Sequence, residues 1–167
     1  MSLNLEQASS LTAVLAVATA GAALTGLSGA ATTYSTSVFG YALNGDAYAK
    51  ALVSGGATPT TDGNTGAPIT LTANKARAIV WAVNAAGTVS VYAGPIVDWT
   101  DTTAGSTACP LPAIPGNVAP FAAHTVQAGS TTVGTWTFGS SNWNATGIAS
   151  ITVRNLCQLR NTPLLTT

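Results

Sequence analysis

The chain has 167 residues, of which five are Lys or Arg and five are Asp or Glu, so its formal net charge is zero. A typical soluble domain carries about 25% charged residues, whereas this chain carries 6% while 47% of its residues are hydrophobic. Five scattered cations cannot neutralise a row of phosphates, which excludes nucleic acid as an expected partner. A neutral protein associates more readily than a charged one. The composition therefore predicts one compact domain that works in a packed assembly.

The N-terminal segment carries no charge between residues 9 and 36 and contains an apolar run over residues 11–24. A secretory signal peptide has Lys or Arg in front of such a run, but the only charged side chain upstream is Glu6. We therefore expect this segment to be retained. Thr and Gly residues interrupt the run, so it also lacks the continuous apolar length of a membrane span. The sequence predicts no membrane association.

The same segment fits two conformations. Leu11, Val14 and Leu15 have helical spacing, but alternate residues also fit a strand. Glycines at positions 21, 26 and 29 end any helix near residue 20. We divide the chain into an extended or partly helical N-terminal arm (residues 1–31) and a body (residues 32–167). Packing of the arm on a partner and packing on its own body are both open. The residues predicted to contact a partner are its large apolar side chains: Leu11, Val14, Leu15, Leu24 and Leu27.

The body has the sequence pattern of short strands and turns. β-Branched and aromatic residues occur in short runs separated by Gly, Pro, Asn and Asp. Asn44-Gly45 predicts a type I′ hairpin turn, and residues 84–87 predict a second hairpin. Further strands are expected at 69–72, 131–138 and 147–153, and many breakers predict a long surface loop over 54–68. Such a series of about seven or eight strands predicts a mainly β fold, an antiparallel β-sandwich or jelly-roll-like body.

A proline-rich stretch occupies residues 109–120. Because Pro has no N–H to donate, this stretch cannot pair in the centre of a sheet. We expect an extended surface connection. It would be either a rigid crossover between sheets or a recognition segment for another protein.

Residues capable of catalysis or metal binding are few. His124 is the only histidine, lies in no nucleophile motif and is expected to be hydrogen-bonded at a strand edge. Asp98 and Asp101 are close enough for paired carboxylates, but a turn leaving a strand explains them equally well. Asp62-Gly-Asn64 offers loop oxygens without the alternating acids of a calcium loop. We expect no enzymatic activity, no cofactor and no metal site.

Two further features leave alternatives open. Cys109 and Cys157 have no second Cys or His nearby, which excludes the usual zinc spacings. They form either a disulfide or two reduced thiols that pack as small hydrophobic groups. Asn144-Ala-Thr146 is a glycosylation pattern, which matters only if the chain enters a secretory pathway.

Three segments resemble small virion proteins of tailed bacteriophages: residues 39–51, 56–62 and 76–91. The resemblance covers about residues 34–95 and rests on structural rather than catalytic motifs. It implies a capsid decoration, or cement, protein, which is a small β-rich module, frequently a homotrimer. Such a protein is made in the host cytoplasm and binds the assembled major capsid protein on the capsid exterior. These proteins act through distributed surface contacts, so no site residues are carried over. The long uncharged N-terminal segment departs from the pattern and leaves a head fibre or tail component open.

The alternative function is a host-surface or carbohydrate-binding adhesive module. In that case exposed aromatic rings would stack on sugar rings. The candidate rings are Tyr34, Tyr48, Trp99 and Trp143.

Overall fold

The computed structural model describes residues 24–99 and 109–155. Within them the fold is mainly β and sandwich-like, as the sequence predicts, with antiparallel sheets and no helix. The described part of the chain accordingly has no helix that could cross a membrane. The strands are β1 (Leu24–Thr25), β2 (Thr33–Thr36), β3 (Phe39–Leu43), β4 (Asp46–Lys50), β5 (Val53–Ala57), β6 (Thr70–Leu71), β7 (Lys75–Asn84), β8 (Val89–Ala93), β9 (Val97–Asp98), β10 (Val118–Ala128), β11 (Trp136–Thr137) and β12 (Ile148–Asn155).

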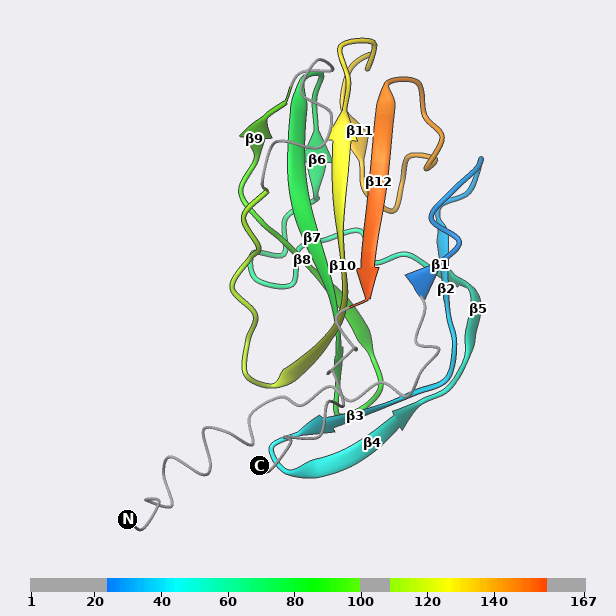
Figure 1. Cartoon of the computed structure of the whole chain (residues 1–167), viewed down its shortest axis with the longest axis vertical. Helices are drawn as coiled ribbons and strands as arrows, with labels where there is room; N and C mark the ends of the chain where they lie inside the picture. The colour runs from blue at the N-terminus through cyan, green and yellow to red at the C-terminus, as the bar shows by residue number, and fades with distance from the viewer. Residues whose placement is uncertain (1–23, 100–108, 156–167) are drawn as a thin grey trace, which may run out of the picture.

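The main sheet has the order β12-β10-β7-β8, and β9 also pairs with β7. The two long central strands β7 and β10 run antiparallel over almost their whole length (Figure 1). Val, Ile and Ala make up most of β7, and seven of its ten positions are buried. A strand that is apolar on both faces must be covered on both faces.

The second layer consists of three smaller units: the sheet β1-β2-β5, the hairpin β3–β4 and the pair β6–β11. Strands β2 and β3 continue into each other, as do β4 and β5. Figure 1 shows that residues 33–57 thus form one long hairpin that curves around an end of the main sheet. We call this segment the bent hairpin.

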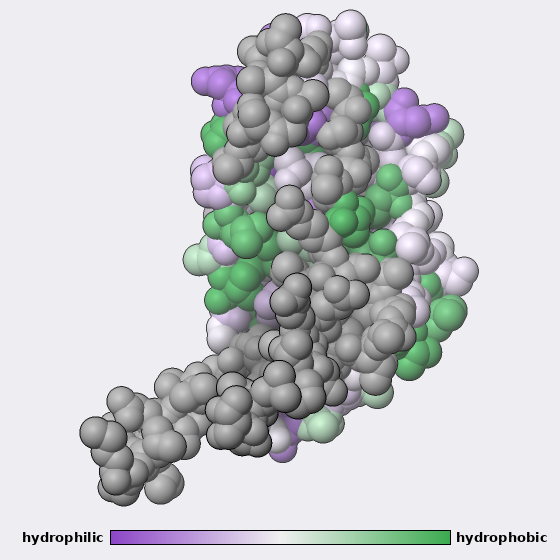
Figure 2. Space-filling view, in the orientation of Figure 1, coloured by the Kyte–Doolittle hydropathy of each residue, from purple (hydrophilic) through white to green (hydrophobic). Residues whose placement is uncertain are grey.

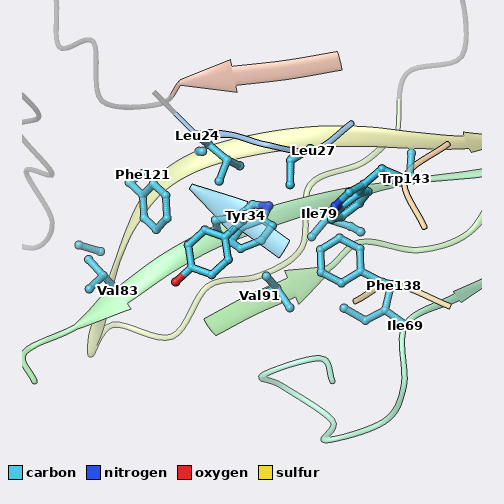
Figure 3. Packing of buried hydrophobic residues seen from close by; sticks show 14 of the residues in the cluster. Leu24, Leu27, Tyr34, Ile69, Ile79, Val83, Val91, Phe121, Phe138 and Trp143 are labelled. Atoms are coloured by element: carbon cyan, nitrogen blue, oxygen red, sulfur yellow. The ribbon is translucent and has the colours of Figure 1, made fainter. Parts of the chain in front are cut away.

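The principal core lies between the main sheet and this second layer. Trp81 and Phe121 are fully buried from the main sheet, and Tyr34 packs on Trp81 with ring centroids 4.9 Å apart. Figure 3 shows Leu24 and Leu27 turned toward the same cluster. Three buried indole rings anchor this core, those of Trp81, Trp136 and Trp143. Trp99 is also buried but is not part of this cluster.

The outer face of the main sheet carries a smaller core of Ala82, Tyr92 and Val118, against which Ile114 packs. The proline-rich connection therefore crosses this face, and residues 109–117 have no regular secondary structure. The prediction is wrong for its last three residues, because Val118–Pro120 belong to β10. β12 joins β10 only from Ala122 onward, and a register shift follows Pro120. A strand accepts a residue without an N–H at such a place.

Both predicted hairpin turns are confirmed. Asn44 and Gly45 have φ of 52° and 90°, the two positive angles of a type I′ turn. At the second turn Gly87 has φ of 77°, and Thr88 N donates to Asn84 Oδ1 at 2.9 Å.

Two predictions on strand positions are wrong. Residues 54–57 are part of strand β5 and not of a surface loop. Gly56 permits close packing, since a Cβ at this position would lie 3.2 Å from the Tyr34 ring. Gly55 has a φ of 63°, which other residues rarely adopt. Conversely, only Trp136–Thr137 of the expected strand 131–138 pairs in a sheet, because Gly134 turns the chain with φ of 71°. The expected strand at 147–153 corresponds to β12.

Candidate interaction surface

Most charged side chains of the described body are matched internally. Lys75 Nζ and Asp98 Oδ1 form an ion pair, which is the only one among the described residues. Arg77 donates from Nε and Nη2 to the backbone oxygen of Gly94 at 3.1 and 2.7 Å. Burial lowers the pKa of Arg77, while the negative charge of Asp62 raises it. Little net charge from these groups is left to face solvent.

Asp62 is a buried structural residue. Its Oδ1 accepts a hydrogen bond from Ala93 N at 3.0 Å, and its Oδ2 accepts one from Thr65 Oγ1 at 2.8 Å. The carboxylate thereby fixes the turn at residues 62–66 to strand β8. Its oxygens are engaged by these donors, and no group of three metal-ligating side chains occurs among the described residues.

Replacing Asp62 with alanine should therefore destabilise the fold by about 2 to 3 kcal/mol, because buried donors lose a charged acceptor. The measurement is the free energy of unfolding in urea. Asp98→Ala is the matched control: Asp98 is 87% exposed, and loss of an exposed ion pair costs at most about 1 kcal/mol. Equal losses for the two variants would contradict a structural role for Asp62.

His124 lies in the centre of the main sheet and not at a strand edge, which corrects the prediction. It is 2% exposed, and Trp81 Nε1 donates to its Nδ1 at 2.9 Å. Its ring stacks on Phe138 and meets Trp143 edge-on. Burial lowers the pKa of His124 to about 3. It is thus a neutral core residue, and no substrate can reach it where it lies.

Three of the four aromatic residues considered for sugar stacking belong to the interior. Tyr34, Trp99 and Trp143 are between 3% and 7% exposed. Trp143 Nε1 also donates to the backbone oxygen of Thr33. Only Tyr48, on β4, is partly exposed, and one of its ring faces stacks on Tyr41.

The C-terminal end of the predicted arm packs on the chain's own body. Leu24 and Leu27 are 4% and 8% exposed, and β1 pairs with β2. The backbone oxygens of Gly29 and Ala31 accept hydrogen bonds from residues 144 and 143. Residues 24–31 thus form part of the body. The other predicted contacts, Leu11, Val14 and Leu15, lie outside the described residues, as do Asp101 and Cys157. Cys109 forms no disulfide with any described residue.

The described surface combines weakly polar regions with isolated apolar side chains. Figure 2 shows strongly hydrophilic residues at only a few places, and separate hydrophobic patches between pale regions. Val38 and Leu52 are 58% and 63% exposed at the curve of the bent hairpin. The remaining large exposed apolar residues are Ile96, Leu111 and Val133. The sequence pattern does not indicate these positions, because apolar residues in short runs are expected to be buried.

A small hollow at one end of the sandwich has a volume of about 150 Å³. The hydroxyl-bearing residues Thr132, Thr135 and Ser141 line it beside Trp136. Pockets for small molecules usually measure about 300 to 1,000 Å³, so this hollow is small for a cofactor.

Comparison with family models, with curated proteins and with solved structures finds no match to this chain. The described residues present a surface with few charged groups, and the hollow beside Trp136 is lined by hydroxyl-bearing and small apolar side chains.

Proposed function

We propose that the chain is a non-enzymatic structural protein of a virion, which binds an assembled phage capsid from outside as a decoration, or cement, subunit. The observation that supports this most is the internal matching of charges in a body that already has few. Lys75 is paired with Asp98, Arg77 is bound to a backbone oxygen, and Asp62 is buried. The major capsid protein is the proposed partner.

Such a surface suits extended contact with another protein. Removing a charged group from water is costly unless it is paired. Small apolar groups do not have this cost, and a hydroxyl group avoids most of it when it forms a hydrogen bond to the partner. The cores of protein interfaces are correspondingly poor in charged residues. The exposed apolar side chains at the bent hairpin, Val38 and Leu52, supply local contact points.

Oligomerisation would strengthen weak individual contacts. A homotrimer, the state that the phage resemblance implies, presents three copies of each contact to a shell that repeats its own sites. Once one copy is bound, the others bind as if at high local concentration. In this proposal the arm contacts a neighbouring subunit or the shell through Leu11, Val14 and Leu15.

Removal of residues 1–23 should leave a folded body that no longer binds the shell. The described body begins at Leu24, so this deletion spares strand β1 and the buried Leu27. Thermal unfolding followed by circular dichroism checks the fold, and co-sedimentation with undecorated shells of the same virus checks binding. We expect an unchanged body and at least a tenfold loss of shell affinity.

Removal of residues 1–31 is the contrasting deletion. It also removes Leu24 and Leu27 and the backbone oxygens that accept from residues 143 and 144, so it should destabilise the body itself. Shell binding retained after deletion of 1–23 would refute the role of the arm. Selective binding of the intact chain to a glycan, without binding to shells, would replace the decoration function by an adhesive one.

A further inference from the structure

In the part of the chain that the structure describes, the outer side of strand β4 is a sheet edge without a partner strand. Among the described residues β4 pairs only with β3, and β5, which continues it, pairs only with β2. Figure 1 shows β4 at the lower margin of the described part of the chain. Exposed edges of this kind form backbone hydrogen bonds with another strand unless something prevents it.

The hairpin geometry determines which backbone groups point outward from β4. Asn44-Gly45 is a two-residue turn, and the residues on either side of it, Leu43 and Asp46, are opposite each other. In such a hairpin alternate residues turn their N–H and C=O groups to the partner strand, beginning with the pair next to the turn. The backbone N–H and C=O groups therefore point to β3 at Asp46, Tyr48 and Lys50. At Ala47 and Ala49 they point to the open edge.

We propose that β4 pairs antiparallel with β4 of a second copy of this chain, about a two-fold axis at Tyr48. In this register Ala47 is opposite Ala49 of the second copy, and these are the residues whose backbone groups point outward. A two-fold contact requires a self-complementary surface, and the sequence Asp-Ala-Tyr-Ala-Lys over 46–50 is self-complementary in charge.

The side chains support the same register. Asp46 is placed opposite Lys50 of the second copy, twice in the dimer, in the pairs where side chains of an antiparallel ladder lie closest. Neither Asp46 nor Lys50 belongs to the ion pair formed by Lys75 and Asp98. The two Tyr48 rings meet at the axis. Each already stacks on Tyr41 with ring centroids 5.4 Å apart, so pairing joins two aromatic pairs into one row.

Alanine at positions 47 and 49 leaves the other face of β4 free of bulky groups, and both residues are exposed. An unpaired Asp or Lys on an edge opposes pairing. In the proposed register each Asp46 is opposite a Lys50 of the second copy, so both charges have a partner. A shift of the two strands by two residues removes at least one of these two ion pairs. The edge is therefore selective for one arrangement.

This contact is a two-fold one and differs from the ring contact of a trimer. It does not depend on binding to a capsid. If the two-fold contact does not form, the proposed function is unaffected. If the chain does not bind shells, the proposed two-fold contact is unaffected.

Charge reversal tests the register. The readout is the self-association constant of the full chain, measured by sedimentation equilibrium at low salt. Asp46→Lys and Lys50→Asp each place like charges opposite one another and should weaken the two-fold contact by about tenfold or more. The double variant Asp46→Lys/Lys50→Asp restores opposite charges and should recover the association to within about threefold. Thermal unfolding of each variant verifies the fold.

A second pair of variants tests the backbone contact. Ala49→Pro removes the outward N–H at the edge and should abolish the two-fold contact, whereas Ala49→Thr keeps the N–H and should retain it. A wild-type chain that never forms the two-fold contact would overturn the proposal. An association that is insensitive to both single reversals, or is not recovered by the double variant, would also overturn it.

Discussion

Replacing Trp81 with alanine is expected to lower the free energy of unfolding by about 4 kcal/mol, the cost typical of removing a fully buried indole. Trp81 has no exposed surface and packs against Tyr34, Phe138 and His124. Its loss would leave a cavity between the main sheet and the second layer. Urea unfolding measures the change, with the slope of the transition used to check that the unfolded states are comparable.

The control is Trp81→Phe, which retains an aromatic ring but loses the Nε1 donor to His124 Nδ1. It should cost less than the alanine variant, in the range of about 1 to 3 kcal/mol for a buried acceptor left without its donor. A loss below about 1.5 kcal/mol for Trp81→Ala, less than half the usual cost of such a truncation, would contradict the central position of this residue.

Acidification should destabilise the fold through His124. Its pKa in the folded chain is about 3, against 6.5 as its ordinary value. Below pH 6.5 the unfolded chain binds a proton that the folded chain does not, so stability is fully present above that pH. It is lost as the pH falls toward 3. The loss amounts to about 1.4 kcal/mol for each pH unit well below 6.5. Unfolding in urea at a series of pH values between 7 and 5 measures it.

No other imidazole contributes to this pH dependence, because His124 is the only histidine in the chain. The rings in contact with it, Trp81, Phe138 and Trp143, do not titrate in this range. His124→Gln retains an acceptor for Trp81 but has no proton to gain. Its stability should be nearly constant between pH 7 and 5. The same slope in both proteins would show that His124 is not the origin.

Local signals predicted the turns because their cause lies within a few residues. Asn44-Gly45 adopts two positive φ angles, and this preference is a property of the two residues themselves. The strands around such turns were predicted for the same reason. The dipeptide Gly55-Gly56 indicates a loop by its composition, whereas the closeness of residue 56 to the Tyr34 ring arises only once β2 and β5 are paired.

Strand β10 forms because of its neighbours in the sheet and is not indicated by its own sequence pattern. It is the longest of the described strands, yet Pro120, Ala122 and Ala123 have little intrinsic preference for β-structure. Pairing with β7 on one side and with β12 on the other makes it a strand. Burial of His124 follows from that pairing and could not be predicted from the residues next to it.

The interaction surface was predictable in kind but not in detail. The low number of charged residues is evident from the composition. The hydrogen bond from Ala93 N to Asp62 Oδ1 joins residues 31 positions apart, so no local pattern indicates it. Leu24 and Leu27 resemble the other apolar residues of the arm in sequence, and only the pairing of β1 with β2 assigns them to the body. The opposite charges at the two ends of residues 46–50 are visible in the sequence. They indicate pairing between two copies only when β4 is known to be an open sheet edge.

The most direct test of the proposed function is the number of copies that bind to one capsid. Undecorated shells of the same virus are titrated with the purified full chain, and bound protein is quantified after sedimentation. The decoration function predicts saturation at a fixed ratio to the major capsid protein, with the bound copies on the outer surface in electron micrographs. No binding, or binding that rises without saturation, would contradict it.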